Sequence, residues 1–260
     1  MTLREFIPKE HGAWAMWIVP MLSSAIATRF SGWFFEFFLS FSLLYIVHHP
    51  IVQIVKRKKP LDRNEFRQVA GLALPAFLLG LAPVVLAGRH WLIVFGAIEL
   101  LLFTVSVRNF LDREQRSFIN ELEIVAALTL TAPAAYYVVS GELDLRAAEL
   151  FLMNFLFFGS SVFYVKMRIE FLKKKGKWEG EAKKALAITL GYHLFLVTIL
   201  IWAAVGDLFN PWLLVGFIPM LVQVISGTLS AKTKVSFSRL GIALVFESVV
   251  FLGVLGVFFR

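Results

Sequence analysis

The chain has 260 residues, of which 58% are hydrophobic and 17% are charged, and its mean hydropathy is +0.75. This composition leaves too little polar surface to cover a soluble globule of such length, and it therefore excludes a water-soluble protein. The net charge of +8 does not indicate a nucleic-acid partner, because the basic residues stand beside apolar stretches, where they face anionic lipid headgroups. The chain has no cysteine, which excludes disulfides, thiolate nucleophiles and cysteine metal ligands.

Nine apolar stretches follow one another along the chain, each close to the ~20 residues that cross a bilayer. An unpaired peptide group in lipid costs several kcal/mol and the alternating pattern of a barrel is absent, so each stretch is predicted to be a helix. The sequence therefore predicts an all-α, polytopic membrane helical bundle with about nine transmembrane helices, forming a single transmembrane domain over residues 1–260. The predicted spans are 12–28, 33–55, 69–87, 91–108, 122–140, 147–165, 184–205, 210–228 and 240–259.

The basic residues divide unevenly between the two sides of this bundle. Of the 26 Lys and Arg residues, 22 lie at the amino terminus and in the second, fourth, sixth and eighth connections, and the other 4 are Arg29, Arg89, Arg146 and Arg260. Basic residues in short connections stay in the cytoplasm. This predicts a multi-pass protein of the cell (inner) membrane with a cytoplasmic N-terminus and an external C-terminus. The longer connections all fall on the cytoplasmic side, where we expect the ligand site.

Several polar residues lie inside the predicted spans: Glu99, His193, Gln223 and Glu247. A polar group in lipid is expensive and indicates a partner on a neighbouring helix. Their ordinary interpretation is helix packing through hydrogen bonds, and a lone histidine such as His193 is seldom a metal ligand.

Three polar clusters on the cytoplasmic side exceed this background. The first, before the first span, combines Lys9, Glu10 and His11 with small residues that permit a close helix approach. It is either a proton-transfer site, with His11 as donor and Glu10 as base, or an anchor at headgroup level.

The second cluster fills the fourth connection. If this segment is helical, Asn109, Arg113, Arg116 and Asn120 repeat at steps of four, three and four and share one face. Two arginines flanked by two amides suit a phosphate or a carboxylate, and Glu121 beside them is a candidate base. A solvated loop is the alternative interpretation.

The third cluster closes the sixth span. Tyr164, a candidate proton donor, lies one helical turn from Arg168, and Lys166 must reach outward or into a cavity from the membrane boundary. At the inner end of the second span, His48 and His49 complete the cytoplasmic rim. Adjacent residues on a helix point about 100 degrees apart, so the two histidines do not share a metal ion. The sequence predicts no metal site.

Several stretches of the chain resemble the YwiC-like family of bacterial and archaeal membrane proteins. They are Pro8 to Met16, Arg113 to Glu121, Ala132 to Tyr137 and Ser161 to Lys166, and the match spans most of the chain. That family is poorly characterised, so the resemblance implies a class of protein and not an activity.

A more distant resemblance is to the UbiA superfamily of intramembrane prenyltransferases. It rests on the nine helices, the internal amino terminus and the long connections after the second and sixth spans, and it implies a UbiA-like fold. Members hold magnesium and a prenyl diphosphate with two aspartate-rich motifs after those helices. At these places the chain has His48 to Gln53 and Tyr164 to Glu170, without the paired carboxylates that magnesium prefers.

We therefore expect a UbiA-like bundle with a lateral cavity whose polar mouth faces the cytoplasm. The expected function is that of an intramembrane enzyme, such as a UbiA-like transferase, or of a binding protein for an isoprenoid, a quinone or another anionic-headed membrane lipid. A small-solute transporter, against which the absence of two equal halves argues, and a non-catalytic subunit of a membrane complex are the alternatives. No cofactor is indicated. The candidate catalytic residues are Glu10, His11, Glu121 and Tyr164, and the candidate substrate-binding residues are Lys9, His48, His49, Asn109, Arg113, Arg116, Asn120, Lys166 and Arg168.

Overall fold

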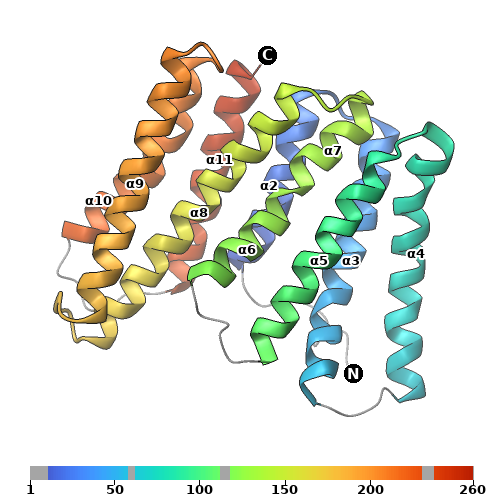
Figure 1. The fold of residues 1–260 in the computed structure, drawn as a ribbon, viewed down its shortest axis with the longest axis horizontal. Coiled ribbons are helices and arrows are strands. Elements are labelled where there is room, and N and C mark those ends of the chain that lie inside the picture. The colour runs from blue at the N-terminus through green and yellow to red at the C-terminus, as the bar shows by residue number, and fades with distance from the viewer. Residues whose placement is uncertain (1–10, 58–61, 112–117, 230–236, 260) are drawn as a thin grey trace.

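The computed structural model describes residues 11–57, 62–111, 118–229 and 237–259, and this part of the chain contains helices and no strand. The helices lie side by side in one bundle (Figure 1). They are α2 (His11–Ala27), α3 (Gly32–Arg57), α4 (Arg63–Ala87), α5 (Trp91–Leu111), α6 (Phe118–Thr129), α7 (Thr131–Ser140), α8 (Leu145–Lys173), α9 (Glu181–Val205), the 3-10 helix η1 (Pro211–Phe217), α10 (Ile218–Leu229) and α11 (Phe237–Phe258).

The predicted membrane bundle is confirmed. Within the described residues, 8 helical segments are long and apolar enough to cross a membrane, and a shorter apolar helix covers Trp14–Ala27 in α2. Two of the eight segments, Phe118–Ser140 and Pro211–Leu229, each contain two consecutive helices. Every predicted span therefore corresponds to a helical segment of a multi-pass membrane protein.

A proline follows each of the two interruptions. Pro133 stands in the first turn of α7 and Pro219 in the first turn of α10. A proline has no N–H and its ring collides with the carbonyl one turn earlier, which favours a break or a kink in a helix. The chain breaks at Leu130 between α6 and α7 and tightens into η1 before α10, whereas α2 and α3 continue through Pro20 and Pro50.

The two largest differences between observed and predicted helix ends are the start of α4 and the end of α8. Helix α4 begins at Arg63 because Asp62 accepts hydrogen bonds from the backbone N–H groups of Asn64 (2.8 Å) and Glu65 (2.7 Å), and the Glu65 side chain returns to the backbone of Asp62. This capping box satisfies N–H groups that would otherwise lack partners. Helix α8 continues to Lys173, beyond the predicted end at 165, because Met167, Arg168 and Phe171 remain buried against other helices.

The two ends of the bundle differ in charge. The helix ends that flank the basic connections lie toward the lower side of the helices in Figure 1, spread across its width from α10 at the left to α4 at the right. They are the last turns of α3, α5, α8 and α10 and the first turns of α4, α6, α9 and α11. We call this the basic end and the opposite one the far end, where α8 starts and α11 finishes. The described residues that the sequence predicts to be cytoplasmic therefore lie toward one end of the bundle.

Helix α8 occupies the centre of one half of the molecule. It packs against α2, α6, α7, α9 and α10, and it carries buried aromatic side chains into a common core. The Phe157 ring stacks on Phe251 of α11 with centroids 4.5 Å apart, and Phe217 of η1 meets Phe251 edge-on at 5.5 Å. These contacts fix the position of α8, and therefore of the polar residues along it.

Candidate functional site

Several predicted site residues cannot be placed. Lys9, Glu10, Arg113 and Arg116 lie outside the described residues. The positions of His11 in α2 and of His49 in α3 are described, but their side chains are not. The predicted shared face of Arg113 and Arg116, and the roles of all these residues, stay predictions.

The sixth span and the fourth connection meet at Lys166. Its ammonium lies 3.1 Å from a carboxylate oxygen of Glu121, the first-turn acid of α6, and 4.6 Å from the centroid of the Phe118 ring. The Lys166 side chain is only 9% exposed, against 31% for Glu121. Phe118 in turn stacks on Phe163 of α8, with 5.3 Å between the centroids. Two predicted site residues that are far apart in sequence therefore lie in direct contact.

A second polar contact joins α5 to α6. The Asn109 amide nitrogen donates to the Asn120 side-chain oxygen (3.0 Å) and to a Glu123 carboxylate oxygen (3.2 Å). Asn120 is buried, and it stands next to Glu121 on α6. The sequence predicts that Asn109 and Asn120 share one face of a single helix; they belong instead to two helices, α5 and α6, whose side chains meet at this hydrogen bond.

Arg168 and Tyr164 point to a different side of α8. The Arg168 guanidinium donates to the backbone carbonyl of Gly227 in α10 (2.8 Å), and the Tyr164 ring packs against Gly227. Lys166 and Arg168 are two residues apart, which turns their side chains about 200 degrees from one another on a helix. The third cluster thus divides into an α6 side, with Lys166, and an α10 side, with Tyr164 and Arg168.

His48 belongs to neither side of α8. It is exposed on α3, and its ring meets the Phe103 ring of α5 edge-on, with centroids 5.2 Å apart. Because α3 packs mainly on α4, this position lies in another part of the basic end. The predicted substrate-binding residues therefore occupy several places at one level of the bundle.

A buried serine–histidine contact lies between α8 and α9. The Ser160 hydroxyl lies 2.6 Å from Nε2 of His193, and Nδ1 of His193 lies 2.7 Å from the Thr189 carbonyl. A carbonyl only accepts, so Nδ1 carries the proton and Nε2 accepts from the hydroxyl. His193 therefore joins two helices through hydrogen bonds, as the packing interpretation of this residue expects.

Another buried polar contact had no signal in the sequence. The Asn154 amide on α8 donates to the Ser23 hydroxyl of α2 (3.0 Å) and to the Leu150 carbonyl (2.8 Å). Both side chains are fully buried. A single asparagine in an apolar stretch does not identify its partner, which is why this link between α2 and α8 was not predicted.

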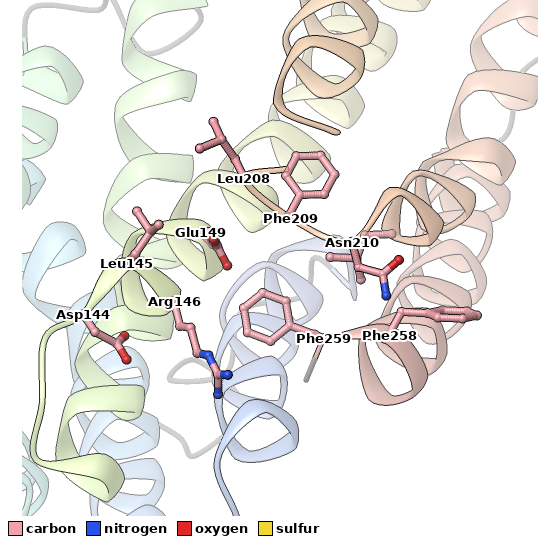
Figure 2. A pocket seen from close by; sticks show the side chains of 10 residues that line it. Asp144, Leu145, Arg146, Glu149, Leu208, Phe209, Asn210, Phe258 and Phe259 are labelled. Carbon is pink, nitrogen blue, oxygen red and sulfur yellow. The ribbon is translucent and has the colours of Figure 1, made fainter. Parts of the chain in front are cut away.

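A cavity of about 390 Å³ opens at the far end of the bundle (Figure 2). Figure 2 shows that charged side chains of the first turns of α8 and aromatic side chains of other helix ends surround it. Its lining is Asp144, Leu145, Arg146, Glu149, Leu208, Phe209, Asn210, Leu213, Phe258 and Phe259. This cavity lies opposite to the cytoplasmic mouth that the sequence led us to expect, and it was not predicted.

The comparisons with known proteins identify the family. The sequence model of the family described as YwiC-like protein matches residues 7–136. The chain belongs to the YwiC-like family. The uncharacterized protein YwiC of Bacillus subtilis (strain 168) is 27% identical over 219 residues, which cover 84% of this chain and 84% of that protein. No solved structure matches the chain.

The family match covers only some of the candidate site residues. Residues 7–136 contain Asn109, Asn120 and Glu121, whereas Lys166 on α8 lies beyond them. The contact between Glu121 and Lys166 therefore joins the part matched by the family to the part that follows it.

Proposed function

We propose that this YwiC-like protein is an intramembrane enzyme or binding protein for an isoprenoid, a quinone or another lipid with an anionic head. The observation that carries the proposal is the buried Lys166 ammonium, held by Glu121 above the Phe118 ring at the basic end of the bundle. A charged residue inside a membrane helix is expensive and marks a functional site by default.

The surroundings of Lys166 suit an anionic head. An ammonium has three N–H donors in a compact arrangement, so one lysine can hold a carboxylate and a phosphate or quinone oxygen at once. The buried amide of Asn120 stands beside Glu121, and the aromatic pair Phe118 and Phe163 offers apolar surface next to the charge. In this proposal Lys166 and Asn120 bind the head, and Glu121 is the base that accepts a proton from the substrate.

The α10 side of α8 provides a second buried cation. Arg168 is buried, with its guanidinium on the Gly227 carbonyl, and Tyr164 lies one turn earlier on the same face. Arg168 would bind a second anionic group, such as the other phosphate of a diphosphate, and Tyr164 would donate a proton to a leaving group.

A UbiA-like fold and a cytoplasmic basic end are part of the proposal. Three features of the described residues support it: the nine helical segments, the interrupted fifth segment, and the placement toward one end of the helix ends that flank the longer connections. Reporter fusions within 56–68 and 166–183 are expected to be cytoplasmic, and a fusion after residue 259 external. A cytoplasmic carboxyl terminus would contradict both the orientation and the comparison with UbiA proteins.

The binding test uses farnesyl diphosphate and a short-chain menaquinone as probes, with thermal unfolding of the purified protein as the measurement. Wild type is expected to be stabilised by at least one of them. The double variant Lys166→Met, Glu121→Gln removes the ion pair without leaving a lone buried charge, so it is expected to fold and to lose the stabilisation. Lys173→Met is the matched control, because Lys173 is half exposed on the same helix. Equal stabilisation of both variants would refute the role of Lys166.

The same assay tests the expected absence of a magnesium requirement. Stabilisation by farnesyl diphosphate is expected to persist in the presence of a chelator, because paired carboxylates are missing at the two places where aspartate-rich motifs would stand. Complete loss with chelator, restored by magnesium, would mean that carboxylates of the basic end assemble a metal site.

A further inference from the structure

The far-end cavity lies where three spanning segments begin or end. Helix α8 starts beside it at Leu145, η1 starts at Pro211, and α11 ends at Phe258. Trp212, exposed on η1, stacks on Phe258 with centroids 5.9 Å apart. Tryptophan at the end of a spanning helix is typical of the headgroup level of a bilayer. The cavity therefore lies at the depth of lipid headgroups, in the leaflet opposite to the basic end.

Arg146 and Glu149 line this cavity and do not form an ion pair with one another. Arg146 and Glu149 are three residues apart on α8, close enough for their charges to interact. Within the described part of the chain, neither side chain makes an ion pair. Both point toward the space in Figure 2. A cationic and an anionic group are thus presented side by side, each able to bind a group of the opposite charge.

The other polar residues of the lining are already oriented. Asp144 caps α8 by accepting from the backbone of Ala147 (3.3 Å), and its second oxygen accepts from the Tyr136 hydroxyl (2.9 Å). The Asn210 side-chain oxygen accepts from the backbone of Trp212 (3.1 Å). An asparagine amide that uses its oxygen in this way keeps its NH₂ group as a donor. Asn210 therefore adds a hydrogen-bond donor to the cavity, and Asp144 adds a fixed negative charge.

We propose that this cavity binds the head of a zwitterionic phospholipid that carries a primary ammonium, of the phosphatidylethanolamine type. Its phosphate contacts Arg146 and the Asn210 amide, and its ammonium contacts Glu149. The leucines and phenylalanines of the lining contact the glycerol and the first acyl carbons. The site shares no residue with the one proposed at the basic end, so either proposal can fail without the other.

The charges of the lining select this head over other common ones. Asp144 and Glu149 outnumber Arg146, which disfavours a lipid with net negative charge. A quaternary ammonium is usually recognised by several open aromatic faces, but one face of Phe258 is taken by Trp212. Carboxylates instead favour an ammonium with N–H donors, because charge-assisted hydrogen bonds are the stronger ones.

The experiment uses the full chain in nanodiscs that contain equal parts of phosphatidylethanolamine, phosphatidylglycerol and phosphatidylcholine with identical acyl chains. Native mass spectrometry after partial delipidation measures which lipid stays bound. Wild type is expected to retain phosphatidylethanolamine in about tenfold excess, the effect of one charge-assisted hydrogen bond. Glu149→Gln is expected to lose this preference while still retaining phospholipid, and Arg146→Gln to lose retention of all three lipids.

Two matched controls come from the same end of the bundle. Arg29→Gln removes an exposed cation between α2 and α3, and Glu36→Gln removes a half-buried carboxylate near the start of α3; neither residue lines the cavity. Both are expected to keep the wild-type preference, and thermal unfolding in the same nanodiscs verifies that every variant is folded. Equal retention of the three lipids by wild type, or an unchanged preference in Glu149→Gln and Arg146→Gln, would overturn the proposal.

A soluble probe separates a lipid site from a site for a small molecule. Glycerophosphoethanolamine presents the same phosphate and ammonium without acyl chains. At low millimolar concentration it is expected to leave the bound phosphatidylethanolamine in place, because the apolar lining contributes to binding only with a lipid. Displacement at that concentration would show that the cavity recognises a free zwitterion and would refute the lipid assignment.

Discussion

Helix α8 and helix α5 are both apolar enough to cross a membrane, yet they meet opposite environments. Of the most apolar part of each span, 67% is buried in α8 and 6% in α5, although the hydropathy of α5 is the higher one, 1.9 against 1.5. The helix that faces lipid is therefore the more apolar of the two. Helix α8 can carry lysine, arginine, asparagine and serine because protein surrounds it and supplies partners for them.

The difference extends to the neighbours of each helix. Around α8, polar side chains reach across to α2, α6, α9 and α10. On the α3–α5 side, α4 packs mainly against α3, and long apolar side chains such as Leu74, Phe77 and Leu101 are exposed to the membrane. We infer that stability and function depend on specific packing and hydrogen bonds around α8, whereas around α5 they depend only on side chains that are apolar. Matched substitutions in the two regions test this inference.

The largest difference is expected at two glycines. In Gly227→Ala the new methyl group would overlap the Tyr164 side chain, with a ring carbon only 2.5 Å away. Separating α10 from α8 to relieve this overlap is expected to lower the free energy of unfolding by about 2 kcal/mol. Gly96→Ala in α5 has nothing within 4 Å of the new methyl and is expected to be neutral or slightly stabilising. Denaturant unfolding in the same detergent measures the free energy of unfolding of both variants. Equal losses in Gly227→Ala and Gly96→Ala would contradict the expected difference between the two regions.

The next effect concerns two carboxylates that pair with lysines of α8. Glu121→Ala removes the carboxylate that lies 3.1 Å from the buried Lys166 ammonium, which is expected to destabilise the fold by roughly 2 kcal/mol, less than for a fully buried pair because Glu121 is 31% exposed. Glu170→Ala removes the partner of Lys173, which is 52% exposed. That surface pair is expected to contribute less than about 1 kcal/mol. A loss in Glu170→Ala as large as in Glu121→Ala would contradict the assignment of Lys166 as a buried charge.

A smaller effect is expected for two serines. Ser160→Ala removes the donor to His193 and with it a hydrogen bond between α8 and α9, worth about 1 kcal/mol in a membrane bundle. Ser42→Ala in α3 removes only a bond to the Phe38 carbonyl of its own helix and is expected to change stability by less than ~0.5 kcal/mol. Thermal unfolding distinguishes them. A larger loss of thermal stability in Ser42→Ala than in Ser160→Ala would contradict the importance of hydrogen bonds between α8 and its neighbours.

These contrasts also show what the sequence could predict. Apolar length predicts the number and the order of the spans, because a bilayer imposes a minimum length on any helix that crosses it, and the structure contains these segments. The direction of the spans, which charge asymmetry predicts, stays a prediction. Helix ends are less predictable, since the start of α4 depends on the Asp62 cap and the end of α8 on packing against residues that are distant in sequence. The UbiA comparison remains a proposal.

The candidate site was predictable only in part. The partnership of Glu121 with Lys166 follows from the expense of a lone charge in lipid, and the structure contains it. The separation of Lys166 from Arg168 follows from helical geometry alone. The far-end cavity combines the ends of α8 and α11 with the start of η1, and no local pattern relates segments so far apart.

The smallest effect is expected for Glu99→Leu in α5, and a large effect there would contradict the comparison of α5 with α8. Glu99 lies half-buried in the middle of α5, and among the described residues it makes no hydrogen bond or ion pair. Replacing it with leucine removes a polar group from an apolar surrounding, so Glu99→Leu is expected to keep wild-type stability within about 0.5 kcal/mol, or to raise it. Probe binding should also be unchanged, because Glu99 is not part of the site that we propose around Lys166. If Glu99→Leu lost probe binding while its thermal unfolding stayed unaltered, the lipid-facing half would carry a functional carboxylate. The contrast between specific packing around α8 and apolar contact with lipid around α5 would then be wrong.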